Sequence, residues 1–234
     1  MRMTTGHADA SADDGRPPAL LWTYTPRELL ADGIVHVLGV ALAVIGATAL
    51  IATALLIRLD PSERVSVGIY ATGLVAMLSV SAAYNMWPVG RLKWRLRRAD
   101  HATIFLMIAG TYTPLVTLVG TGSLAWGLLA GIWLVAVAGA AIKLALPGRF
   151  DRLAVGLYLA LGWSGMMAYD SVIGLLAPQA LTLLAAGGLL YSAGVIFHLW
   201  RGLPFQNAIW HGFVLAAAAC HYGAVFHSMI AAAA

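Results

Sequence analysis

"DGIVHVLGVALAVIGATALIATALLI", residues 32–57, is the stretch that decides the fold class. After His36 it carries no charged residue until Arg58. A helix rises 1.5 Å per residue, so about 20 apolar residues are needed to cross the hydrocarbon core of a bilayer. Residues 37–57 meet that requirement, and the stretch therefore predicts a membrane-spanning helix.

The composition of the whole chain agrees with a membrane protein. Of its 234 residues, 61% are hydrophobic and only 10% are charged, and the mean hydropathy is +0.83. A soluble domain usually carries about 25% charged residues. The net charge of +4 does not indicate a nucleic-acid partner, because the basic residues lie between apolar runs, where membrane topology places them. Membrane lipids are the expected partners.

Apolar runs recur along the chain, and each ends at a charged, proline-containing or glycine-containing break. We expect seven spans, at 31–57, 66–87, 101–119, 124–144, 153–175, 179–199 and 207–230. The expected fold is an all-α seven-transmembrane-helix bundle formed by residues 28–234. Residues 1–27 lack an apolar core and are expected to form a disordered cytoplasmic tail. Asp151 is expected to cap the fifth helix.

The basic residues predict the orientation. All but two of the 14 Lys and Arg residues fall on the side of the N-terminal tail, and the exceptions are Arg58 and Arg64. Positive residues favour the cytoplasmic side. The N-terminus is therefore expected in the cytoplasm and the C-terminus outside, as an odd number of spans requires.

Several polar residues are expected at one depth, near the cytoplasmic ends of the helices. Three pairs are spaced four apart, so each pair shares a helix face. Asp100 is expected to open the third helix, where a role as its N-cap is the simpler alternative. Polar groups at helix ends can simply meet headgroups and water, but ionisable groups within a membrane usually face the protein interior. We therefore expect a polar pocket formed by Asp32, His36, Ser81, Asn85, Asp100, His101, Asn207 and His211.

These residues also carry a family resemblance. The segments concerned are "ELLADGIVH" (28–36), "SAAYN" (81–85), "RRADHATIFLMIAGTYTP" (97–114) and "NAIWHGFVLAAAACH" (207–221). The chain resembles the bacterial hemolysin III proteins, which belong with the progestin and adipoQ receptors and are distantly similar to alkaline ceramidases. The resemblance implies seven helices, a bacterial inner-membrane location and a zinc site near the inner face.

In the family pattern, Ser-x-x-x-His on the second helix and His-x-x-x-His on the seventh supply the zinc ligands, and an aspartate on the third holds the metal-bound water. Ser81, Asp100 and His211 match this pattern. Asn85 and Asn207 occupy the other two histidine positions, and an amide is a poor zinc ligand. The resemblance thus implies a degenerate site and no cofactor. Zinc remains the alternative if His36, His101 or His198 replaces the missing ligands.

Three functions follow as hypotheses. The first is a non-catalytic member of this family, whose proteins are described as channel-forming or cytolytic. The second is a zinc-dependent hydrolase of lipid amides, with Asp100 orienting the water and Ser81 steadying the oxyanion. The third is a lipid-sensing receptor or a regulator of membrane homeostasis. The loss of two zinc ligands favours a protein that is not an enzyme.

Overall fold

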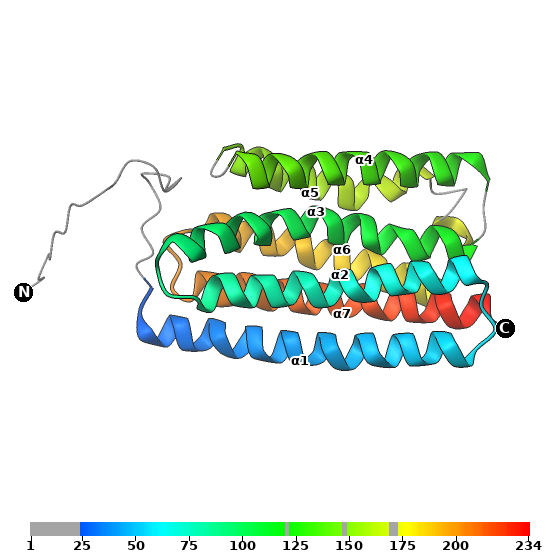
Figure 1. Ribbon diagram of the computed structural model, residues 1–234, viewed down its shortest axis with the longest axis horizontal. Coiled ribbons are helices and arrows are strands. Elements are labelled where there is room, and N and C mark those ends of the chain that lie inside the picture. The colour runs from blue at the N-terminus through cyan, green and yellow to red at the C-terminus, as the bar shows by residue number, and fades with distance from the viewer. Residues whose placement is uncertain (1–23, 120–121, 147–148, 169–172) are drawn as a thin grey trace, which may run out of the picture.

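The structure, a computed structural model, describes residues 24–119, 122–146, 149–168 and 173–234, and across these residues the chain is all-helical. Figure 1 shows long helices lying side by side, with α1 starting at one end of the bundle and the C-terminus at the other. The α-helices are α1 (Pro26–Leu56), α2 (Pro61–Met86), α3 (Arg91–Val119), α4 (Ser123–Ala145), α5 (Asp151–Trp163), α6 (Pro178–Leu199) and α7 (Gln206–Ala232).

Six of these helices are long and apolar enough to cross a membrane: α1, α2, α3, α4, α6 and α7. The protein is therefore an integral, multi-pass membrane protein. The remaining helix, α5, has 13 residues and extends only about 20 Å. Two short 3₁₀ helices, η1 (Ser164–Ala168) and η2 (Ile173–Leu175), follow it.

The fifth expected span, 153–175, is thus not one continuous α-helix. The α-helix ends at Trp163. At this end, the hydroxyl of Tyr112 on α3 forms hydrogen bonds with backbone groups of the chain. It donates to the carbonyls of Leu161 (3.1 Å) and Gly162 (2.8 Å) and accepts from the N–H of Gly165 (2.7 Å). Backbone groups at membrane depth must be satisfied inside the protein, and Tyr112 satisfies those freed by the change of helix type.

The first helix begins at Pro26, two residues before the boundary expected at residue 28. The signal is "TPRE": Thr25 and Glu28 form a capping box, and proline occupies the first helical position. Residues 1–23 of the expected tail lie outside the described residues.

The third helix also begins early, at Arg91 rather than near 101. The charged residues 91–98, expected in a loop, form its first turns, and Lys93 and Arg97 are buried there. Lys93 Nζ donates to the carbonyls of Asn85 (3.0 Å) and Trp87 (2.9 Å) at the end of α2. Asp100 therefore lies in the third turn of α3, and the alternative that it is an N-cap is wrong.

On α1, several apolar side chains are exposed and two ionisable ones are buried, which is the reverse of the pattern in a soluble protein. Apolar side chains such as Ile34, Leu38 and Leu42 are about half exposed, whereas Asp32 and His36 are buried. Lipid is the solvent for the outer face, so apolar exposure carries no hydrophobic penalty there. The buried stripe of α1 consists of Asp32, His36, Gly39, Ala43, Ala47, Leu50 and Ala54. Its small residues let α1 pack closely on α2 and α7, which turns the polar pair inward.

Candidate functional site

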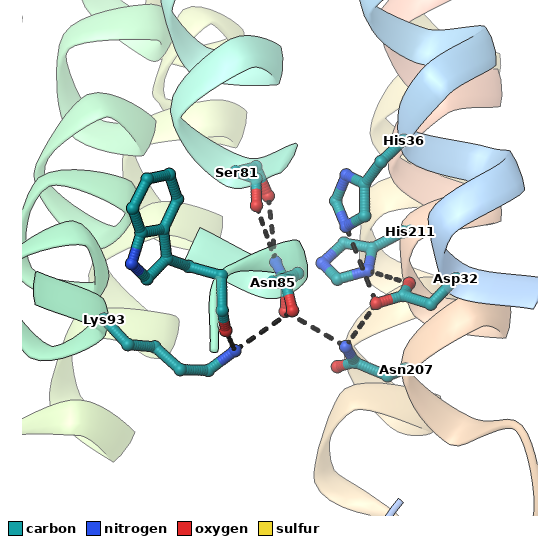
Figure 2. Close-up of polar contacts among 8 residues, drawn as sticks. Asp32, His36, Ser81, Asn85, Lys93, Asn207 and His211 are labelled. Atoms are coloured by element: carbon teal, nitrogen blue, oxygen red, sulfur yellow. Dashed lines mark hydrogen bonds and ion pairs between the residues drawn. The ribbon is translucent and has the colours of Figure 1, made fainter. Parts of the chain in front are cut away.

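Asp32 lies at the centre of a polar cluster where α1, α2 and α7 meet (Figure 2). His211 Nδ1 and Asp32 Oδ1 are hydrogen-bonded at 2.6 Å, and Asn207 Nδ2 donates to Asp32 Oδ2 at 2.9 Å. His36 Nε2 is 3.6 Å from Asp32 Oδ2. Asp32 is only 5% exposed. Polar side chains of α1 and α7 surround its carboxylate, which would otherwise be buried without partners.

The two asparagines bond to each other within this cluster. Asn207 Nδ2 also donates to Asn85 Oδ1 at 3.1 Å, and Asn85 Nδ2 donates to the Ser81 carbonyl at 2.9 Å. A continuous hydrogen-bonded chain therefore runs from α2 through α7 to Asp32 on α1 (Figure 2). It joins three helices at the end of the bundle where α1 begins.

His36 is the member of the cluster with unused bonding capacity. It is 4% exposed, and its Nε2 has no hydrogen-bond partner. Its ring centroid lies 4.3 Å from that of His211, at an interplanar angle of 54°. Buried polar atoms nearly always have a partner, so an unpartnered one calls for a physical explanation.

A small cavity adjoins the two histidines. Its volume is about 50 Å³, and its polar lining comes from His36, Ser81, Asp100 and His211, with apolar side chains of α2 and α7 around them. This space holds a few water molecules or a partly hydrated ion. It is too small for the amide group and flanking chains of a lipid.

The arrangement does not fit zinc at the positions that the resemblance implies. Asn207 presents its NH₂ group to the cluster, and the oxygen of Asn85 already accepts from Asn207. An amide N–H donates hydrogen bonds and offers no lone pair to a metal. Of the three implied ligand positions, only His211 offers an imidazole, so the residues present do not form that site.

The three histidines expected as replacement ligands lie in different places. Only His36 contacts His211. The ring of His198 packs on Trp210 at a centroid distance of 4.9 Å, and the ring of His101 points toward Asp151, with Nδ1 3.9 Å from Oδ1. His101 therefore lies outside the cluster, although it was expected in the pocket.

A second charged cluster, centred on Asp151, was not foreseen. Lys143 Nζ donates to Asp151 Oδ1 at 2.6 Å, and Arg97 donates to Oδ2 at 2.7 Å. Asp151 is the first residue of α5, after its N-cap Phe150, so its expected role as the cap is wrong. A lysine within an apolar run, such as Lys143, is the sequence signal that could have indicated a buried partner.

A larger hollow lies near the other end of the bundle and offers no comparable chemistry. It has a volume of about 370 Å³ and is lined by Ser123, Leu124, Gly127, Leu128 and Met167. Because this lining is almost entirely apolar, the polar cluster around Asp32 remains the candidate site.

Comparisons with known proteins agree with the architecture. The family model described as "Haemolysin-III related" matches residues 25–222. Hemolysin-3 of Bacillus cereus is 34% identical over 197 residues, covering 84% of this chain and 90% of the relative. The hemolysin-3 homolog of Bacillus subtilis is 33% identical over 199 residues, covering 85% and 93%. The human monocyte to macrophage differentiation factor is 34% identical over 188 residues, covering 76% and 77%. On these matches, the chain belongs to the haemolysin III-related family.

Proposed function

We propose that the protein is a non-hydrolytic member of its family, with a closed, ion-sized polar pocket at the cytoplasmic ends of α1, α2 and α7. The observation that carries this proposal is the hydrogen-bonded chain through Asn85, Asn207 and Asp32. It occupies two positions at which the resemblance implies zinc ligands. Without those ligands, a zinc ion cannot be held at the positions that the resemblance implies for hydrolysis.

The proposed topology has seven spans, with the N-terminus in the cytoplasm of a bacterial cell and the bundle in its inner membrane, surrounded by lipid. The fifth crossing would combine α5 with η1, η2 and the residues between them. The buried cations Lys93, Arg97 and Lys143 support this orientation. They belong to the first turns of α3 and the last turn of α4, and these helix ends lie where α1 begins (Figure 1).

The names of the Bacillus relatives raise lysis as an activity. In this chain, apolar side chains pack the bundle beyond the polar pocket, among them Leu50, Val67 and Leu74. This packing supports a closed bundle rather than a water-filled channel within one copy. We therefore propose that a single copy contacts lipid without conducting.

A lipid-amide hydrolase is the second candidate, and one observation favours it. Ser81 and Asp100 line the same cavity as His211, as a hydrolase with a water-orienting aspartate would require. The cavity volume of about 50 Å³ weighs against it, because a substrate carbonyl must reach the attacking water.

The deciding experiment is an assay of ceramide hydrolysis by the purified full-length protein, with and without added zinc. The wild type and His211→Ala should both release fatty acid at the rate of protein-free micelles. Zinc-dependent release by the wild type that His211→Ala abolishes would contradict the proposal and establish the hydrolase.

A further inference from the structure

Three metal-binding side chains converge in the pocket, and two of them come from α1. One ligand atom from each of Asp32, His36 and His211 lies within 4.8 Å of the others. We propose that these residues bind a divalent transition-metal ion, zinc being the best match. The inference rests on the proposed closed pocket, and it names the ligand that the pocket takes.

The donor set fits the chemistry of zinc. Zinc sites with an open position use three protein ligands, and two imidazoles with one carboxylate is a common combination. Tetrahedral coordination with bonds of about 2.1 Å separates ligand atoms by about 3.4 Å. The His36–Asp32 separation of 3.6 Å is already close to that value, so small side-chain rotations complete the site.

The unpartnered nitrogen of His36 is an independent reason to expect a ligand. His36 Nε2 is buried without a hydrogen-bond partner, and it points toward Asp32 (Figure 2). A bound cation would satisfy it. Metal binding would replace the hydrogen bond between His211 and Asp32, because metals compete with protons for the same lone pairs.

Asn207 has a supporting role in this arrangement. Asn207 donates to Asp32 Oδ2 and thereby fixes the orientation of the carboxylate, as outer hydrogen bonds do at metal sites. The adjoining cavity leaves space for a water as the fourth ligand. The metal centre would thus take two ligands from α1 and keep His211 on α7, with Asn207 beside it. The ion would link α1 to α7.

Zinc content provides the test. Full-length protein without a polyhistidine tag is loaded with zinc, passed over a chelating resin and measured by mass spectrometry, as wild type, His36→Ala, Asn85→Ala and His227→Ala. We expect about one zinc per chain in the wild type and in the last two variants. Asn85 is outside the donor set, and His227 is exposed. His36→Ala should bind zinc at least ~100-fold more weakly. This loss of affinity is larger than the loss expected when only an outer hydrogen bond is removed.

Size-exclusion chromatography checks that each variant is folded, and His36→Gln replaces His36→Ala if the latter aggregates. Zinc-free wild type after loading would overturn the inference, as would full zinc in the folded His36 variant. The hydrolysis assay separates this result from the proposed function. Absence of both zinc and hydrolysis overturns only the metal site, whereas zinc together with hydrolysis overturns only the non-hydrolytic role.

Discussion

Two carboxylates, the buried Asp32 and the partly exposed Asp151, lie at the same end of the bundle, and they differ in what surrounds the negative charge. Asp151 is paired with permanent cations, Lys143 and Arg97, at 2.6 and 2.7 Å. Within the described part of the chain, the ion pairs of Asp32 are with imidazoles, those of His36 and His211. An imidazole can be neutral, protonated or bound to a metal, whereas an arginine stays charged.

This difference separates a structural ion-pair cluster, here called a clamp because it holds helices together, from a binding site. The Asp151 cluster joins α3, α4 and the start of α5, and its two cations already neutralise the carboxylate. The Asp32 cluster leaves a buried nitrogen of His36 without a hydrogen-bond partner. We therefore expect substitutions in the first cluster to change stability alone, and substitutions in the second to change stability and ion binding together.

The largest effect is expected from Asp151→Asn. This change leaves two largely buried cations without their counter-ion, which should lower the free energy of unfolding by about 3 kcal/mol. Thermal unfolding in detergent, followed by circular dichroism, measures it. Asp60→Asn is the matched control, because Asp60 is an N-cap and asparagine caps helices equally well. Equal melting temperatures for the two variants would show that Asp151 is not a clamp.

An intermediate effect is expected from Asp32→Asn. Without zinc, the change replaces one carboxylate oxygen by an NH₂ group, so either His211 or Asn207 loses its acceptor, which should cost about 2 kcal/mol. With zinc at 100 times its dissociation constant, the wild type should gain about 2.7 kcal/mol, because the ion binds the folded state alone. Zinc should not stabilise the variant. The melting temperatures of both proteins without zinc measure the stability lost, and those with zinc measure the stabilisation by the ion. An equal zinc-induced shift in the variant would exclude Asp32 as a ligand.

The smallest effect is expected from Asn85→Ala. It removes the acceptor for Asn207 and the donor to Ser81, which should cost about 1 kcal/mol. The zinc-induced rise in melting temperature should persist, because Asn85 lies outside the donor set. Loss of that rise would instead assign Asn85 to the metal site, as in the pattern implied by the resemblance.

Much of the fold could be predicted from the sequence, because a membrane requires long apolar helices with internally satisfied backbones. The run after His36 is an example. The early start of α3 was missed because Lys93 and Arg97 were interpreted as exposed topology signals, although both are buried. The end of the α-helix at Trp163 depends on Tyr112, about 50 residues away. A contact between residues so distant in the sequence leaves no local pattern.

For the candidate site, the sequence could predict how deep each polar residue lies along its helix, but not the direction in which its side chain points. His36, His101 and His198 were all expected near the cytoplasmic ends, but each residue along a helix rotates the side chain by about 100°. Packing decides which of the three faces His211. The stripe of small residues on α1 turns His36 inward, whereas His101 points toward Asp151. The link between Asn85 and Asn207 likewise depends on how α2 and α7 each pack against α1.

Anomalous diffraction at the zinc absorption edge, from crystals of the zinc-loaded full-length protein, tests the central claim most directly. The account predicts one peak within bonding distance of Asp32, His36 and His211, with Asn85 and Asn207 hydrogen-bonded to each other beside it. A peak ligated by the two asparagines, or no peak in this pocket, would contradict it.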